Sequence, residues 1–273
     1  AYKNYKKFNL ERSHHKERSR RGFKLEEWSE SQIREREPDL SKEYKWGYFV
    51  DDYGWITNPY RLVKCLTRHA IQLGMRFEQA AVLDAELDGN YVKTLITSRG
   101  IRPVKNLIIA AGAYSHLLSQ KFGDQVPLET ERGYHVTIKN PNVGINLPIM
   151  DSDMKTWITP MEVGIRCAGT VELASLEAPA NQRRYLLLIK LLKRMLPELD
   201  TKDYTTWMGR RPTLPDSLPV ISRSALVSNV FYAFGHQHLG LTGGPMTAQW
   251  LIELLQGRVP NQDLAAFRVN RFD

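Results

Sequence analysis

The chain has 273 residues, of which 42% are hydrophobic and 25% are charged, as in an ordinary folded globular protein. This composition excludes a disordered or fibrous protein, and no apolar run approaches the ~20 residues that a membrane-spanning helix needs. Two cysteines, Cys65 and Cys167, are too few for a disulfide framework and lie in no metal-binding pattern. We therefore expect a cytoplasmic protein, with peripheral attachment at the inner membrane as the alternative.

The net charge of +8 is concentrated at the beginning of the chain. Residues 1–24 contain nine Lys and Arg against Glu11 and Glu17, so the remainder is close to neutral. Such a segment is either an arm for nucleic acid or an anionic surface, or a solvated helix face. We favour the helix face and expect no nucleic-acid partner.

The first third of the chain predicts helices. Residues 25–40 predict a loop followed by a short helix that Pro38 ends. Residues 58–73 predict an amphipathic helix with Pro59 at its first position, and Gly74 ends it.

Short strands follow. The alternation of apolar and polar residues predicts strands at 76–79, 82–87 and 91–97, the last two joined by a hairpin turn at residues 88–90. Residues 107–111 are continuously apolar, which is typical of a strand buried on both faces in a parallel sheet.

The second half of the chain alternates between strands and helices. Residues 132–172 show β alternation, and residues 181–196 predict an amphipathic helix before Pro197. A glycine-rich turn at 235–244 precedes a helix predicted over 245–256. Further strands are predicted at 205–209, 219–221 and 230–234. The whole pattern predicts an α+β fold with a large mixed or antiparallel sheet and an α/β portion.

The glycine-rich turn is one of two stretches that suggest chemistry. Glycines at a strand end let a ligand approach the backbone, and the following helix offers free N–H groups to it. A tight turn without a ligand explains the glycines equally well. His236 and His238 lack a third ligand at a sensible spacing, so we predict no metal site.

The second stretch contains Arg211. Pro212 holds it in an extended conformation, where its guanidinium can clamp a carboxylate through two hydrogen bonds. The alternative is that this side chain binds backbone carbonyls or pairs with Asp216.

Several segments together resemble the family of FAD-dependent D-amino acid oxidases and dehydrogenases, in family order and spacing, most closely the D-amino acid and D-hydroxyproline dehydrogenases. They are REREPDL (34–40), GYFVDDYGWITNPYRLVKCL (47–66), LIIAAGAYS (107–115), ERGYHVTI (131–138), GRRPTLPDSLPVI (209–221), YAFGHQHLGLTGG (232–244) and FRVNRF (267–272). The resemblance implies a β-sheet substrate domain and a Rossmann-like FAD domain.

The chain departs from this family in one respect. Members begin with a G-x-G-x-x-G turn that holds the FAD pyrophosphate, and the 273 residues contain no such motif. We therefore expect a truncated chain with little or no activity by itself. FAD is the expected cofactor, and its absence from this chain is the alternative. The expected domains are a basic helical segment (1–46), FAD-domain elements (47–110 and 200–273) and a substrate-binding sheet domain (111–199).

The resemblance assigns roles to particular residues. Arg211 would bind the substrate carboxylate, with Tyr134 and His236 bordering the substrate. Val82 and Gly112 would contact FAD. The flavin ring would lie against Gly235, His236, Gln237, His238, Leu239, Gly240, Leu241 and Thr242. No residue is assigned an acid–base role.

The resemblance thus implies an FAD-dependent oxidoreductase that oxidises the C–N bond of a small amino acid by hydride transfer to flavin. The alternative is a catalytically inactive remnant that serves binding or oligomerisation. Apolar surface left exposed would favour a homo-oligomer.

Overall fold

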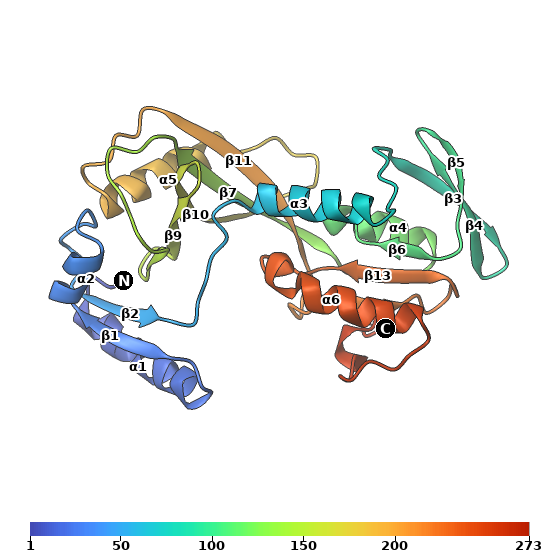
Figure 1. Cartoon of the computed structure of the whole chain (residues 1–273), viewed down its shortest axis with the longest axis horizontal. Helices are drawn as coiled ribbons and strands as arrows, with labels where there is room; N and C mark the ends of the chain where they lie inside the picture. The colour runs from blue at the N-terminus through green and yellow to red at the C-terminus, as the bar shows by residue number, and fades with distance from the viewer. Residues whose placement is uncertain (273) are drawn as a thin grey trace. The chain divides into compact units, whose positions relative to one another are not determined.

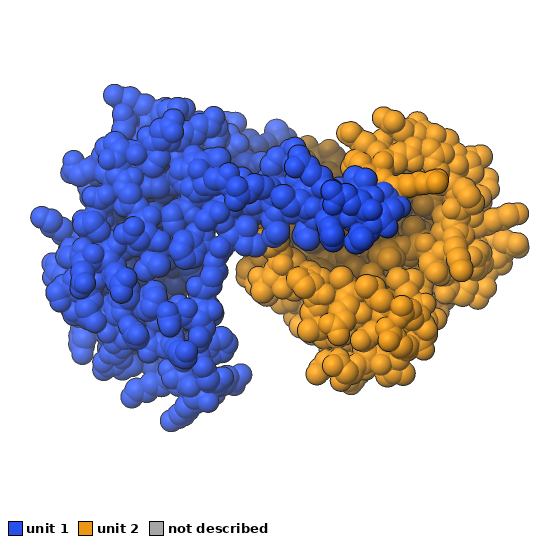
Figure 2. Space-filling view, viewed as in Figure 1, with its two compact units in different colours: residues 1–75, 133–171, 179–208 blue, residues 76–132, 172–178, 209–273 orange. Residues whose placement is uncertain are grey.

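The computed structural model describes residues 1–272, which form two compact units (Figures 1 and 2). Unit 1 consists of residues 1–75, 133–171 and 179–208, and unit 2 of residues 76–132, 172–178 and those from 209 onward. The fold is α+β with mainly antiparallel sheets, as the sequence predicts. The three expected domains stay a prediction, because compactness does not assign a role to a segment.

The basic N-terminal segment is a packed part of unit 1. Helix α1 (Tyr5–Arg20) begins at Asn4, whose side chain accepts the N–H of Lys6 at 2.8 Å. Phe8 is buried and its ring stacks on Tyr48 at 4.7 Å. The helix is therefore held by an aromatic cluster rather than extending freely from the unit.

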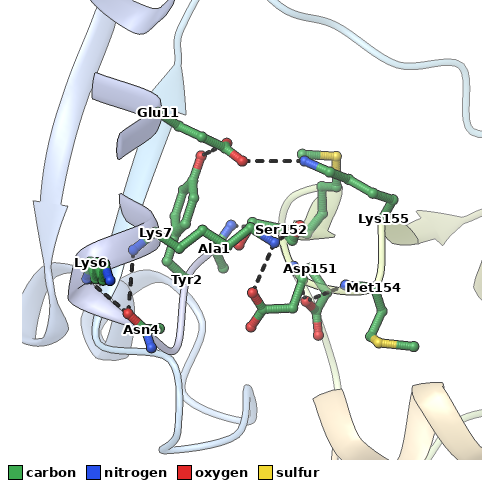
Figure 3. A network of polar contacts seen from close by, with 12 residues as sticks. Ala1, Tyr2, Asn4, Lys6, Lys7, Glu11, Asp151, Ser152, Met154 and Lys155 are labelled. Carbon is green, nitrogen blue, oxygen red and sulfur yellow. Dashed lines mark hydrogen bonds and ion pairs between the residues drawn. The ribbon is translucent and has the colours of Figure 1, made fainter. Parts of the chain in front are cut away.

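Polar contacts also join α1 to a distant loop of unit 1. The Tyr2 hydroxyl donates to Glu11 at 2.6 Å, and Lys155 forms an ion pair with the same carboxylate at 3.4 Å (Figure 3). Burial would raise the pKa of Glu11, but the contacts with Tyr2 and Lys155 outweigh it and lower this pKa. Further along α1, Arg12 binds Glu27, so part of the positive charge is neutralised locally.

The next elements of unit 1 differ in one place from the prediction. The expected helix is α2 (Glu30–Arg36), which a capping box of Ser29 and Gln32 begins. The preceding residues form a strand, β1 (Leu25–Ser29), and not a loop, because all of them pair antiparallel with β2 (Trp46–Val50).

The second predicted helix is confirmed as α3 (Pro59–Gln72), capped by Asn58. Its apolar residues are more exposed than an amphipathic pattern suggests. Val63 and Leu66 keep more than half of their surface accessible.

The main sheet has the strand order β11-β7-β10-β9-β8. Its strands are β7 (Glu129–Ile138), β8 (Ile149–Asp151), β9 (Thr156–Met161), β10 (Gly164–Leu173) and β11 (Tyr204–Thr213). Strands β7, β10 and β11 have residues in both units. Helix α5 (Gln182–Met195), the predicted amphipathic helix, packs on one face of the part in unit 1.

The core of unit 1 lies between α5 and this sheet. Alternate residues of β7 and β10 point into it, and α5 contributes Leu188, Leu192 and Met195. Cys167 is buried there and its thiol donates to the Leu188 carbonyl at 3.6 Å. Burial raises the pKa of this thiol to about 12, so it behaves as an apolar group.

Unit 2 contains two three-stranded sheets. One has the order β3-β4-β5, formed by β3 (Val82–Asp88), β4 (Tyr91–Thr97) and β5 (Gly100–Pro103). The other has the order β12-β13-β6, formed by β6 (Leu107–Ile109), β12 (Val220–Arg223) and β13 (Val230–Phe234). Strand β6 is followed by two short helices, η1 (Gly112–Tyr114) and α4 (Ser115–Lys121). Strand β13 is followed by α6 (Gly240–Leu255), and η2 (Ala265–Phe267) lies near the C-terminus.

Two strand predictions in unit 2 need correction. Residues 76–79 form no strand, since β3 begins at Val82, where its pairing with β4 starts. The strand from Leu107 is parallel to β13 as predicted, but it is not buried on both faces. Successive side chains point to opposite faces of the sheet, and only one face is covered here, since Ile109 is buried while Ile108 is 42% exposed.

Among residues 1–272, no helix combines the length and the apolar character needed to cross a membrane.

Leu188→Ala should lower the free energy of unfolding by about 2–5 kcal/mol, because a fully buried side chain is removed from the core of unit 1. Leu186→Ala, on the same helix but 62% exposed, should change it by less than about 0.5 kcal/mol. Urea denaturation followed by circular dichroism measures both. Equal effects would contradict the packing of α5 on the sheet.

Candidate functional site

Two strand-to-helix junctions meet at one edge of a sheet in unit 2. Strand β13 runs parallel to β6, with Val230 opposite Leu107 and Tyr232 opposite Ile109. Strand β6 leads to η1 and α4, and β13 leads to α6. The carboxyl ends of neighbouring parallel strands form the edge at which α/β sheets bind ligands.

Each junction contains a glycine in a left-handed conformation. Gly112 has φ +57°, and a Cβ added there would meet nothing within 4 Å. Gly235 has φ +88°, and a Cβ there would lie 2.5 Å from the Leu214 side chain. The left-handed backbone and the nearby Leu214 side chain both favour glycine at position 235, whereas open space lies beside Gly112.

The second junction is ordered by a chain of hydrogen bonds. His236 Nε2 and the Thr247 hydroxyl lie 2.8 Å apart, and that hydroxyl donates to the Gly243 carbonyl at 2.9 Å. Burial lowers the pKa of His236, which keeps the imidazole neutral at neutral pH. The ring packs close to the first turn of α6, since a Cβ added at Gly243 would lie 3.6 Å from the His236 Cδ2.

Metal binding at this junction has no support. His238 is exposed, and His236 is engaged with Thr247. The part of the chain that the structure describes contains no group of three His, Cys, Asp or Glu placed to hold a metal ion.

Helix α6 begins earlier than predicted. The Gly243 N–H donates to the Leu239 carbonyl at 2.8 Å, so the first turn starts at Gly240 and Pro245 lies inside the helix. No side chain caps this N-terminus. Its first N–H groups therefore point out of the helix end and can serve as donors to a ligand.

Of the two adjacent arginines on β11, only Arg210 has a hydrogen-bond partner. Its Nε donates to the Leu176 carbonyl at 2.5 Å. Asp216, the alternative partner considered for Arg211, is bound by Arg271 at 2.7 Å. Within residues 1–272, the half-buried Arg211 guanidinium makes no hydrogen bond or ion pair.

The electrostatics of Arg211 follow from this placement. Burial lowers its pKa, and the charge of Glu131 opposes that change without forming an ion pair. A desolvated guanidinium with free donors is suited to a carboxylate.

Two other predicted residues have different surroundings. Tyr134 is 1% exposed in the core of unit 1, and its hydroxyl accepts the N–H of Asn181 at 3.1 Å. Tyr134 thus packs in this core, and its place beside the substrate stays a prediction. Val82 begins β3 opposite Thr97, and its side chain is partly exposed.

A buried ion pair in unit 2 was not predicted from the sequence. Arg132 is 1% exposed and donates to Glu172 at 2.7 Å and to the Ala178 carbonyl at 2.6 Å. It fixes both ends of the segment 172–178, whose Leu176 carbonyl Arg210 binds. Arg132 and Glu172 are 40 positions apart in the sequence, so a search for local patterns does not find this pair.

The sequence also did not predict the polar face of unit 1, which is the face of the main sheet opposite the core. His135 on β7 stacks on Trp207 of β11, with ring centroids 5.0 Å apart. Burial, and then the charge of Arg166, lower the pKa of His135 to about 4. The signal in the sequence is the alternation itself, because Tyr134 and Val136 point into the core and His135 points away from it.

Comparison with known proteins identifies the family. The family model described as "FAD dependent oxidoreductase" (DAO) matches residues 3–254, so the chain belongs to this family. It is 39% identical over 250 residues to a D-amino-acid oxidase of Bradyrhizobium diazoefficiens, covering 90% of this chain and 59% of that protein. It is 30% identical over 213 residues to a D-amino acid dehydrogenase of the same organism, covering 77% and 50%. The chain thus spans between half and three fifths of the length of these relatives.

Solved structures show the same fold. Glycine oxidase from Geobacillus kaustophilus has a TM-score of 0.87 at 19% identity, covering 99% of this chain and 73% of that one. L-proline dehydrogenase from P. horikoshii has a TM-score of 0.78 at 17% identity, covering 99% and 76%.

Gly235→Ala should destabilise the protein by about 2 kcal/mol or more, because the added Cβ meets Leu214 and the backbone is left-handed. Gly244→Ala is the matched control. It lies within α6 with nothing within 4 Å, and should stabilise the helix by up to ~1 kcal/mol. Thermal denaturation of both variants compares them, and a tolerated Gly235→Ala would refute the close packing.

The lowered pKa of His135 predicts a pH dependence of stability. Between its ordinary value of 6.5 and about 4, the unfolded chain takes up a proton that the folded protein does not. This histidine therefore makes the free energy of unfolding fall as the pH is lowered through that range. His135→Gln should flatten the pH profile, measured by urea denaturation at several pH values, while the exposed control His69→Gln should leave it unchanged.

Proposed function

We propose that this chain belongs to an enzyme that oxidises the C–N bond of a small D-amino acid, with FAD as the hydride acceptor. The observation that carries the proposal is the half-buried Arg211 guanidinium, which has neither an ion pair nor a hydrogen bond among residues 1–272. The family supports FAD, and two relatives act on D-amino acids by name. We also propose a cytoplasmic location, with which two free cysteines are consistent. We further propose a homo-oligomer, with which the exposed apolar side chains are consistent.

The second junction and Gly112 suit a flavin cofactor. The uncapped N-terminus of α6 supplies backbone donors to electron-rich groups, and the open space beside Gly112 leaves its backbone accessible. We propose that Gly112 contacts FAD and that the turn from Gly235 to Thr242 lies along the flavin. Val82 is proposed to contact the cofactor through its backbone.

In this proposal each residue of the chain has a limited task. Arg211 binds the substrate carboxylate through two parallel N–H donors, which fixes the direction of the α-carbon C–H bond. His236, held by Thr247 and neutral, borders the substrate without transferring a proton. The chemistry that FAD would supply when bound is acceptance of the hydride from the α-carbon. The substrate nitrogen loses a proton, and the imino acid is then hydrolysed in water to a 2-oxo acid and ammonia.

Flavin binding is tested first, by the visible absorption spectrum of the protein after FAD is added and the excess is removed. Gly112→Val should abolish retained flavin, because its side chain would occupy the open space. Gly89→Val is the matched control, with φ +58° and equally open surroundings in the β3–β4 hairpin, and should retain flavin. The proposal would be refuted if the wild-type chain stays colourless and a longer protein, including any residues that the gene encodes before Ala1, stays colourless too.

Arg211→Met should lower kcat/KM for D-amino acids at least ~30-fold, since a desolvated ion pair to the substrate is lost. Flavin retention should not change. Arg258→Met, which removes an exposed arginine of unit 2, should leave the kinetics unaltered. Steady-state assays with D-alanine measure both variants, and normal kinetics for Arg211→Met would remove this residue from the site.

A further inference from the structure

A second arginine without a counter-ion lies on the polar face of unit 1. Arg166 stands on β10 between Ile165 and Cys167, which both point into the core, so its own side chain lies on the opposite face. Its Nε donates to the Thr137 hydroxyl at 3.3 Å. The two Nη groups have no hydrogen bond or ion pair with any residue from 1 to 272.

Among residues 1–272, the Nη groups of Arg166 have neither a carboxylate nor a backbone carbonyl as a partner, although the side chain is half-buried. Burial alone lowers the pKa of Arg166, and no acidic side chain counteracts it. The half-buried Arg34 of unit 1, by comparison, donates through both Nη groups to backbone carbonyls of residues 40, 41 and 44. A desolvated cation without a partner is costly in the free protein and is compensated when an anion binds.

Aromatic rings flank Arg166 on the same face. The stacked pair of His135 and Trp207 lies on the neighbouring strands β7 and β11. On the other side, Trp157 of β9 pairs with Ala168, two residues after Arg166, and is 44% exposed. The low pKa of His135 means that its imidazole is neutral, so the guanidinium is the sole cation among these groups at neutral pH.

We propose that Arg166, His135, Trp207 and Trp157 form a binding site for a small dicarboxylate, with one carboxylate on the free Nη groups and the carbon chain against the rings. The planar fork of a guanidinium matches the two oxygens of a carboxylate. Exposed aromatic faces supply apolar contact for a short methylene chain. The ligand is either a dicarboxylic acid or an acidic amino acid, which share this chemistry. The proposal concerns unit 1 by itself and stands whether or not the proposed function is correct.

The test is titration calorimetry of the whole chain with glutarate, carried out in the Arg211→Met background so that the other free arginine does not contribute. Arg166→Gln should weaken glutarate binding at least tenfold. Arg61→Gln removes the same charge from an exposed ion pair of unit 1 and should bind as the parent does. Arg166→Lys keeps the charge without the fork and should fall between them.

A second readout separates binding from folding. The indole N–H resonance of Trp207, assigned by its loss in Trp207→Phe, should shift on addition of glutarate and stay in place in Arg166→Gln. The thermal midpoint of Arg166→Gln should equal or exceed that of the parent, because an uncompensated charge has been removed.

Titration with D-glutamate shows whether the ligand is an acidic amino acid or a dicarboxylic acid without an amino group. Binding of D-glutamate that depends on Arg166 would mean that the site accepts acidic amino acids, and binding of glutarate alone would mean a dicarboxylic acid without an amino group. Equal glutarate affinity in Arg166→Gln and the parent, or no binding to the parent, would overturn the proposal. Failure of the wild-type protein to bind flavin or to oxidise D-amino acids would instead count against the proposed function.

Discussion

The parallel pairing of β13 with β6 is the constraint on which the candidate cofactor site depends. These strands are separated by about half of the chain, yet their pairing brings the turn at Gly112 and the turn at Gly235 to one edge of a sheet. A helix follows each turn, so backbone donors collect at that edge. Each turn contains a glycine in a left-handed conformation, Gly112 in the first and Gly235 in the second.

The main sheet illustrates a second consequence of strand geometry. Because neighbouring residues of a strand point to opposite faces, β7 places Tyr134 in the core of unit 1 and His135 on the polar face. Of two adjacent residues in one motif, one can therefore pack in the core while the other is available on the opposite face. A family motif marks the segment, and the direction of each side chain decides the role of the residue.

The arginines divide into those with partners and those without. Arg132 is satisfied by Glu172 and the Ala178 carbonyl, and Arg271 by Asp216. Arg211 and Arg166 are half-buried and have no such partners among the described residues. Since desolvation of a cation is unfavourable unless an anion compensates it, these two positions mark where an anionic ligand would be bound most effectively.

The sequence by itself predicted the order and type of most elements, because periodicity, helix caps and glycine turns are local signals, and its motifs resemble the family whose model matches the chain. It predicted α5 and the β3–β4 hairpin, but placed the start of α6 at Pro245, since the bond from Gly243 to Leu239 depends on the turn before it. Only the tertiary structure decided that Asp216 pairs with Arg271 and leaves Arg211 free, that Tyr134 is buried, and that Arg166 lies beside the pair of His135 and Trp207. Those contacts join residues far apart in the chain, and their strength depends on burial, which no local pattern specifies.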